Sequence, residues 1–326
     1  MRPISGSTRK PLRLSTRLSF PFIKGRRTVV DRFGVMPRFG FLLSLFLLVN
    51  ALPLAAQKNP QRIVSTAPSI TESLFALGLG NQVVGVSRYC SFPPEVQKLP
   101  RVGTYLKPDP EAIARLAPDL VVLERGATDL MGRLNALHIA FVEVPHDTLD
   151  DIYNEIQIIA KAAGVPERGT ALVAQIKASL ASIQIKAKAL PSPRVIVIVD
   201  RKQGTLSDMV AVGAGNYVNR ILEIAGADNV LAMPNLPHYP HISLETVIRE
   251  NPDVIVDLSG TQETPEAQEA SRASAISLWK EHTELKAVRD GRVYAGTSNV
   301  LVVPGPRTPL ATQRLFDYIH GSGGGS

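Results

Sequence analysis

One stretch of the chain recurs 134 residues later, and this repeat constrains the fold more than any other feature. Residues 111–123 read Glu-Ala-Ile-Ala-Arg-Leu-Ala-Pro-Asp-Leu-Val-Val-Leu, and residues 245–257 read Glu-Thr-Val-Ile-Arg-Glu-Asn-Pro-Asp-Val-Ile-Val-Asp. Each copy predicts a short helix that begins at a glutamate, a Pro-Asp turn, and a strand suited to a parallel sheet covered on both faces. A period this long is too large for a solenoid and indicates two similar lobes, with a ligand cleft expected between them.

Strands and helices alternate around both copies. The expected strands outside the repeat are 62–65, 83–86, 140–144 and 195–199, and the expected helices begin near Pro68, Asp129, Tyr217 and Thr308. Such alternation favours parallel pairing with right-handed crossovers. The predicted fold class is therefore α/β, with two Rossmann-like lobes.

A single long helix is predicted to join the lobes. From Pro166 to about Leu190 no turn signal interrupts the chain, and apolar residues recur at helical spacing. A helix of about 25 residues would be roughly 37 Å long, enough to cross between two lobes. The predicted parts are a leader (1–56), a first lobe (57–165), the connecting helix (166–190), a second lobe (191–320) and a flexible Gly/Ser tail (321–326).

The net charge of +7 is concentrated near the N-terminus. Residues 1–56 contain ten Lys and Arg residues and one acid, Asp31, which leaves 26 basic and 28 acidic residues in the remainder. The nearly neutral remainder removes the main argument for a nucleic-acid partner. Because basic residues precede the apolar run 41–49 and small residues end at Ala56, the leader is typical of a cleaved secretory signal.

The alternative is an uncleaved membrane anchor, but the apolar run is shorter than the roughly 20 residues that a spanning helix needs. Met36 is an alternative start that would give a signal of ordinary length. The only cysteine, Cys90, lies far beyond the signal, so the sequence predicts neither a disulfide framework nor a lipid-anchoring cysteine. We expect an exported protein that is not lipid-anchored.

Several segments, taken in order, resemble one family. They are Arg62-Ile-Val-Ser-Thr-Ala-Pro-Ser-Ile-Thr-Glu-Ser-Leu-Phe-Ala-Leu-Gly78, Val84-Gly-Val-Ser-Arg-Tyr-Cys-Ser-Phe-Pro-Pro94, Lys98–Gly103, both repeat copies, and Leu285–Tyr294. Together they resemble the helical-backbone periplasmic metal-receptor proteins, which are the solute-binding subunits of ABC importers for cobalamin, ferric siderophores and haem. The resemblance spans about residues 61–320, and the Tyr-x-x-Phe-Pro-Pro loop is most similar to the cobalamin-binding branch.

The resemblance implies that Glu111 and Glu245 dock the protein onto a membrane permease. In the family, one glutamate on each lobe contacts arginines of the permease, and these two match by position and by internal symmetry. Charge complementarity of this kind fixes register and speeds encounter. The alternative is that each glutamate is a first-turn acid that the helix dipole favours.

Four aromatic residues are expected to contact the ligand: Tyr89, Phe92, Tyr105 and Tyr239. They fall where aromatic contacts occur in cobalamin-binding relatives, and flat rings suit a macrocycle because they bury much area at low entropic cost. Ordinary loop-anchoring aromatics are the alternative. Some relatives carry tryptophan at the positions of Tyr105 and Tyr239, whereas the only tryptophan here, Trp279, is expected to pack in the second lobe.

His238 and His241 flank Tyr239 and are further candidates. They could contact a ligand or ligate its metal. However, prolines exclude a helical ligand pair and no carboxylate cluster completes a site, so polar loop residues are the favoured interpretation. Asn299 and Arg307 are additional expected ligand contacts, and Cys90 is expected to be a small buried apolar residue.

An exported α/β enzyme is the rival function class. Residues 212–218, Val-Gly-Ala-Gly-Asn-Tyr-Val, resemble a dinucleotide fingerprint but lack its third glycine, so Gly213 and Gly215 are expected to serve a tight turn instead. We therefore expect a monomeric, non-enzymatic binding protein that delivers a metal chelate to an ABC permease and has no resident cofactor. A cobalt corrinoid is the predicted ligand, and a ferric siderophore or haem is the alternative.

Overall fold

One parallel and one mixed β-sheet, with the helices that cover them, form the part of the chain that the structure describes. The structure is a computed structural model, and it describes residues 59–260, 265–296 and 300–321. The predicted leader, all but the first residue of the tail, and Asn299 lie outside this part. None of the described helices is long and apolar enough to cross a membrane.

The first lobe is a four-stranded parallel sheet with strand order β2-β1-β3-β4. Successive residues of its strands face opposite layers: Ile63 and Val122 pack with one set of helices, whereas Val64 and Val121 pack with the other. The strands are β1 (Ile63–Ser65), β2 (Val83–Val86), β3 (Leu120–Glu124) and β4 (Phe141–Val144), and the helices α2 (Pro68–Ala76), α3 (Pro110–Arg115) and α4 (Thr128–Ala136) lie between them, with short 3-10 turns at Gly80–Gln82 and Pro94–Lys98.

The second lobe repeats this frame and extends it. Strands β7, β5, β9 and β10 are parallel, and β6 and β8 add two antiparallel strands beside β5. The strands are β5 (Arg194–Asp200), β6 (Met209–Ala211), β7 (Asp228–Asn229), β8 (His241–Ile242), β9 (Val254–Asp257) and β10 (Val293–Ala295), and the helices are α7 (Tyr217–Ile224), α8 (Leu244–Glu250), α9 (Pro265–Lys280), α10 (Lys286–Arg289) and α11 (Thr308–His320). As expected, Trp279 is fully buried in this lobe.

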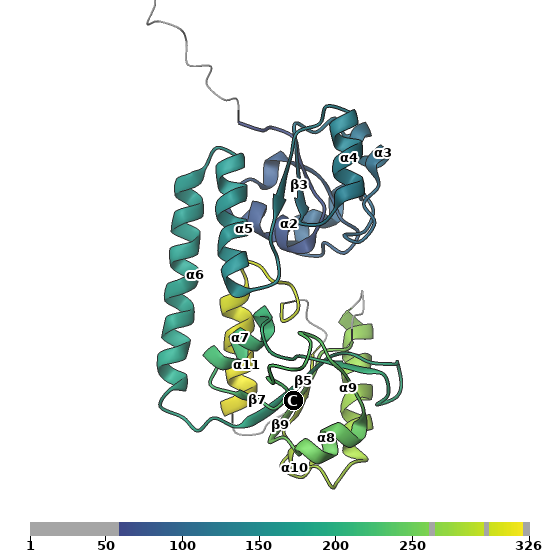
Figure 1. The fold of residues 1–326 in the computed structure, drawn as a ribbon, viewed down its shortest axis with the longest axis vertical. Coiled ribbons are helices and arrows are strands. Elements are labelled where there is room, and N and C mark those ends of the chain that lie inside the picture. The colour runs from purple at the N-terminus through teal and green to yellow at the C-terminus, as the bar shows by residue number, and fades with distance from the viewer. Residues whose placement is uncertain (1–58, 261–264, 297–299, 322–326) are drawn as a thin grey trace, which may run out of the picture. The chain divides into compact units, whose positions relative to one another are not determined.

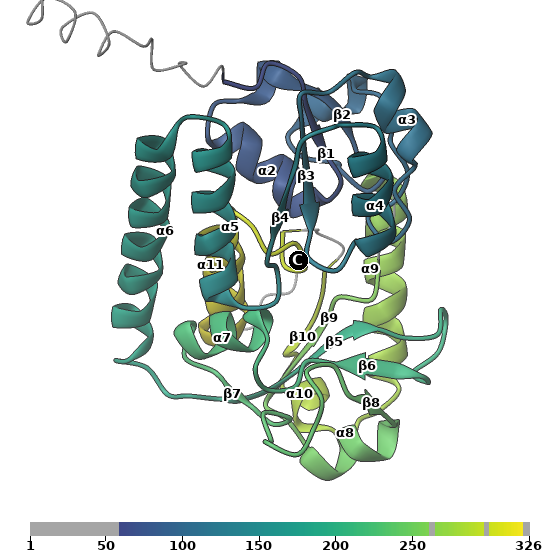
Figure 2. The same ribbon diagram turned by 45° about the horizontal axis from the view of Figure 1, so that its top comes forward.

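The helix α6 (Pro166–Ala187) joins the lobes, as Figures 1 and 2 show. It ends three residues before the predicted limit, and it packs against α5 (Leu149–Ala162) and against α11. Gly169 permits the close approach of α5, because a Cβ at this position would lie 2.5 Å from the Cβ of Ala160. The joint is therefore a packed helical layer rather than an isolated rod.

Sequence analysis missed α5 altogether. The helix begins at a capping box, in which the Thr148 hydroxyl accepts from the Asp151 N–H and the Asp151 carboxylate accepts from the Thr148 N–H. Its buried positions Ile152, Ile156 and Ile159 follow helical spacing. Both signals are local and could have identified the helix.

The two repeat copies fold as predicted, each as a helix, a turn and a strand. Asp119 accepts from the N–H groups of Gln61 and Arg62 at 2.8 and 2.9 Å, and Asp253 accepts from the N–H of Arg194 at 2.9 Å. The aspartate of each Pro-Asp turn thus fixes the start of the first strand of its lobe.

The residue before each Pro-Asp pair ends the repeat helix in a left-handed conformation. The φ angle is 44° at Ala117 and 41° at Asn251, a region that L-residues rarely adopt. The guanidinium groups of Arg62 and Arg194 donate to carbonyl groups at the ends of α3 and α8, respectively. Carbonyls that have no partner within the helix are thereby satisfied.

Candidate functional site

The loops that follow the carboxyl ends of the strands carry the aromatic candidates in the first lobe. The ring centroids of Tyr89 and Tyr105 lie 5.8 Å apart in an edge-to-face arrangement, and the two side chains are 53% and 45% exposed. The Arg101 guanidinium donates to the carbonyls of Ser87 and Cys90 and so shapes the loop that bears Tyr89. The structure therefore brings together two of the four predicted aromatic residues.

Tyr239 lies in the loop between β7 and β8 of the second lobe and is 43% exposed. The path of this loop depends on the glycines of the 212–218 segment. The Gly213 N–H donates to the carbonyl of His238 at 2.9 Å, and a Cβ on Gly213 would lie 2.4 Å from the carbonyl oxygen of Pro237. Gly215 has a φ of 83° and lies against the His238 ring. The glycines thus serve a turn, as expected, and they also permit the 237–240 loop to pack closely against this segment.

Phe92 and Arg307 join the two lobes. The Arg307 guanidinium carbon lies 4.2 Å from the centroid of the Phe92 ring, a cation–π distance. The same guanidinium pairs with the carboxylate of Glu72 on α2: Nε lies 2.8 Å from Oε2, and Nη2 contacts Oε1. Sequence analysis placed Arg307 among the ligand contacts, whereas the structure gives its guanidinium two partners from the first lobe.

Glu72 was not among the predicted site residues. It is the only acidic residue of α2, a helix that is buried throughout residues 69–74, and a charged residue within such a helix is a signal of a buried ionic contact. Burial raises the pKa of the Glu72 carboxyl, and the Arg307 hydrogen bond and charge oppose that rise.

Asp147, at the carboxyl end of β4, also approaches the second lobe. Its carbonyl accepts from the N–H of Tyr217, the first residue of α7, at 3.1 Å. Burial raises the pKa of the Tyr239 hydroxyl, and the negative charge of Asp147 adds to the rise. The Tyr239 phenol is thus held in its neutral form, which can donate a hydrogen bond. The position of Asp147 in the loop that follows a strand is the signal that could have identified it.

His238 and His241 are both exposed. His241 is in β8, opposite Val210 of β6, and within the described ranges no three His, Cys, Asp or Glu residues gather as metal ligands would. Cys90 is buried 3.1 Å from the Thr71 hydroxyl, and burial raises the pKa of its thiol to about 11. A thiol of this kind is a small apolar side chain rather than a nucleophile.

Glu111 and Glu245 occupy matching positions in the first turns of α3 and α8, and both are exposed. The Glu111 carboxylate lies 3.4 Å from the Arg133 guanidinium. The Ser243 side chain lowers the pKa of the Glu245 carboxyl, which keeps it ionised. Each carboxylate is therefore an exposed negative charge in the first turn of its helix, where the helix dipole favours an acidic residue.

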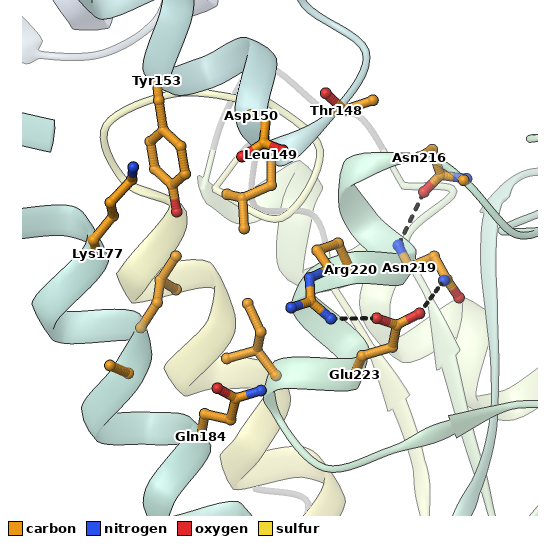
Figure 3. Close-up of a pocket in the computed structure, with 14 residues that line it drawn as sticks. Thr148, Leu149, Asp150, Tyr153, Lys177, Gln184, Asn216, Asn219, Arg220 and Glu223 are labelled. Atoms are coloured by element: carbon orange, nitrogen blue, oxygen red, sulfur yellow. Dashed lines mark hydrogen bonds and ion pairs between the residues drawn. The ribbon is translucent and has the colours of Figure 1, made fainter. Parts of the chain in front are cut away.

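A pocket of about 460 Å³ lies elsewhere, among α5, α6 and α7 (Figure 3). Three of its charged side chains have partners: Arg220 pairs with Glu223 at 2.6 Å, and Lys177 lies 4.6 Å from the centroid of the Tyr153 ring. Because none of the predicted ligand-contacting residues lines it, we do not take this pocket as the candidate site.

Comparison with known proteins shows which family the chain resembles. The model of a family described as periplasmic binding protein matches residues 63–300. The ABC transporter substrate-binding lipoprotein YvrC of Bacillus subtilis is 28% identical over 272 residues, which cover 81% of each chain. The vitamin B12-binding protein of Vibrio cholerae is 26% identical over 277 residues, 84% of this chain and 94% of that protein.

A solved structure has the same two-lobed architecture. The periplasmic heme-binding protein RhuT of Roseiflexus sp. RS-1, in its apo form, superposes with a TM-score of 0.70 at 27% identity. The match covers 81% of this chain and 99% of that one. The predicted fold class is therefore confirmed, and the related proteins are binding proteins.

Proposed function

Because the chain belongs to the periplasmic binding protein family, we propose that it is the solute-binding protein of an ABC importer. In this role it captures a corrinoid between its lobes in the periplasm and delivers it to a membrane permease. The names of the two relatives, a substrate-binding lipoprotein and a vitamin B12-binding protein, support this assignment.

One observation carries the choice of ligand: four partly exposed aromatic rings are presented by loops of both lobes. Tyr89, Tyr105 and Phe92 come from the first lobe and Tyr239 from the second. Flat apolar faces with hydroxyl groups at their edges suit a macrocycle that carries amide side groups. The neutral Tyr239 phenol is suited to donate a hydrogen bond to such an amide.

Haem is the second candidate, favoured by the resemblance to a heme-binding protein and by the Tyr239 and His241 side chains, which are possible axial ligands. The raised pKa of Tyr239 opposes the phenolate form that iron ligation by tyrosine uses. The aromatic set, with this preference for the neutral phenol in addition, is why we place the corrinoid first. A ferric siderophore, which is usually anionic, would favour clustered cations in these loops. Arg88 and Lys107 are exposed there, but the Arg101 guanidinium is already bonded to loop carbonyls, so the cations are sparse.

Calorimetric titration of the mature protein with cyanocobalamin, haemin, and a hydroxamate and a catecholate ferric siderophore tests the proposal. We expect cyanocobalamin to bind most tightly, and we expect Tyr89→Ala and Tyr239→Ala each to weaken it by about 1–3 kcal/mol. Ile185→Ala, at an exposed apolar residue of α6, is the matched control and should not change the affinity. Tight binding of a siderophore or haemin without any heat from the corrinoid would refute the choice of ligand, whereas the proposed role in an importer would stand.

Docking onto the permease is proposed to use Glu111 and Glu245. The double variant Glu111→Ala/Glu245→Ala should bind ligand normally and associate weakly with the permease, with the largest difference at low salt, where exposed charges are least screened. Association equal to that of the unaltered protein would refute this role.

Export is proposed to remove the leader. Protein recovered from the periplasm should begin near Gln57, as N-terminal sequencing would determine, whereas cytosolic protein that retains residues 36–56 would contradict the proposal.

A further inference from the structure

The side chains of Glu72 and Arg307 are the strongest polar link between the lobes. Glu72 belongs to α2 and Arg307 directly precedes α11, so 235 positions separate them along the chain. Their side chains are only 4% and 17% exposed. Two guanidinium nitrogens meet two carboxylate oxygens, the bidentate geometry that gives arginine–carboxylate pairs both strength and a fixed orientation.

The backbone near Arg307 also packs against the first lobe. A Cβ at Gly305 would lie 3.5 Å from Oε2 of Glu72 and 3.7 Å from the Cα of Ser69. The carbonyl of Gly305 accepts from the Thr308 hydroxyl at 2.7 Å, which fixes the turn that leads into α11. The segment that presents Arg307 therefore packs against α2 and carries a turn that is held by a hydrogen bond.

Separation of the two side chains would be costly. A buried carboxylate or guanidinium without its partner loses its Coulombic stabilisation, whereas its desolvation cost remains unless water reaches it. An arrangement of the lobes that opens this contact must therefore hydrate both groups. The pair consequently favours one spacing of the lobes at this point.

The pair also orients a wall of the candidate ligand site. The plane of the guanidinium is fixed by the carboxylate, and it covers part of the Phe92 ring while the side chain of Phe92 stays 41% exposed. In the described part of the chain, Glu72 is linked to Phe92 only through the Arg307 guanidinium, which contacts both side chains. Its influence on ligand binding is therefore indirect.

We propose that Glu72 and Arg307 form an inter-lobe clasp, and that Glu72 is a positioning residue that fixes the lobe spacing and, through Arg307, the Phe92 wall of the ligand site. The part that concerns ligand rests on the proposed binding function, whereas the clasp itself does not. Preorganisation of this kind raises affinity because less ordering remains to be done on binding.

The test measures the distance between the lobes without ligand. Spin labels on cysteines introduced at the exposed positions Asn135 in α4 and Arg249 in α8 report that distance by pulsed electron spin resonance. Cys90 is buried, and a sample with Cys90 alone serves as the labelling blank. We expect one narrow distribution for the otherwise unaltered protein, and a broader or longer one for Glu72→Gln and for Arg307→Gln.

Two further variants separate the clasp from general destabilisation. Arg201→Gln breaks the ion pair with Asp257, which is as deeply buried but lies wholly within the second lobe. It should lower the unfolding temperature and leave the distance unchanged. Arg307→Lys keeps the charge but loses the bidentate fork, so its distribution should lie between those of the unaltered protein and Arg307→Gln, and it remains informative if Arg307→Gln does not fold.

Affinity completes the test. Cyanocobalamin should bind Glu72→Gln about tenfold more weakly than the unaltered protein, mainly through faster dissociation. Distance distributions that stay unchanged in both Glu72→Gln and Arg307→Lys would overturn the clasp, and an unchanged affinity despite a broadened distribution would overturn the positioning role. If the unaltered protein binds no corrinoid, the proposed function fails, and the ligand-free distances still decide the clasp.

Discussion

The two lobes share a frame but differ at the carboxyl ends of their strands. The order β2-β1-β3-β4 in the first lobe matches the order β7-β5-β9-β10 in the second, and the repeat helix and strand hold corresponding places. The second lobe adds β6 and β8, and the 237–240 loop that leads into β8 carries Tyr239. In the first lobe the aromatic residues lie in loops of a purely parallel sheet. A common frame thus supports two different surfaces.

The two lobes also differ in where they bury a charged side chain. Asp257, at the end of β9, accepts from the Arg201 Nε and the Trp279 indole N–H, both at 2.9 Å. Its counterpart in the first repeat copy is Leu123, which is fully buried among apolar side chains. Besides Glu72, the first lobe buries the carboxylate of Glu155 on α5, where the Ser73 hydroxyl donates to one oxygen and the other has no hydrogen-bond partner. Asp257 is thus paired with a cation of its own lobe, whereas Glu155 has no ion-pair partner among the described residues.

The largest expected effect comes from replacing Asp257 of the second lobe by leucine, the residue at the matching position of the first lobe. Asp257→Leu leaves the Arg201 guanidinium buried without its partner, and we expect a loss of about 3–5 kcal/mol in the free energy of unfolding. Denaturant unfolding measures it. Asp200→Asn is the control, since Asp200 ends the neighbouring strand β5 at an exposed position. If Asp257→Leu were as stable as the control, the network would contribute nothing.

The second effect depends on pH. Burial raises the pKa of Glu155 from 4.5 to about 8, so its neutral form stabilises the fold below about pH 4.5, and this contribution is lost as the pH rises through about 8. Glu155→Gln should abolish this loss and make the variant more stable than the parent by roughly 2–4 kcal/mol at pH 9.

Thermal unfolding of the Glu155→Gln variant and its parent from pH 5 to pH 9 measures the difference. Ser73→Ala is a useful companion, because it removes the donor to Glu155 without changing the carboxyl itself. Parallel pH curves for Glu155→Gln and its parent would show that this carboxyl does not titrate in that range.

A smaller effect should distinguish the turn aspartates of the two repeat copies. We expect Asp119→Ala, which loses two backbone donors, to cost about 1–2 kcal/mol, and Asp253→Ala to cost a similar or smaller amount. Urea unfolding at pH 7 gives both values. If Asp119→Ala were neutral and Asp253→Ala costly, the two turns would not be equivalent.

Acid should affect the Asp253 contribution in particular. Although partial burial opposes it, the Arg194 N–H and Lys286 lower the pKa of Asp253 below 3.8. Its stabilisation is therefore present above about pH 3.8 and is lost as the pH falls through the lowered value. The difference between Asp253→Ala and its parent should shrink in acid.

The smallest effect is expected at the matched glutamates. Glu111→Gln and Glu245→Gln should leave the unfolding temperature unchanged, because both side chains are exposed and surface charges contribute little to stability. A marked loss of stability in either variant would argue for a structural rather than a docking role. Arg133→Gln, which removes the partner of Glu111 alone, tests whether the lobes differ here.

The sequence by itself determined the frame of this protein. The repeat predicted both helix–turn–strand units, since the residues that define each unit are neighbours along the chain and their periodicity is visible. The same local reasoning identified Gly213 and Gly215 as turn residues, Trp279 as a core residue and α6 as one helix. It could also have found α5, whose capping box and apolar spacing are equally local.

Only the tertiary structure decided which side chains meet at the candidate site. It paired Arg307 with Glu72 and Phe92, brought the Tyr105 ring to Tyr89, and set Asp147 beside the start of α7. These partners belong to different loops and helices, and no periodic pattern links them. Their proximity results from how two sheets and a connecting helical layer pack, because burial of the shared apolar core fixes the distances between elements that the sequence places far apart.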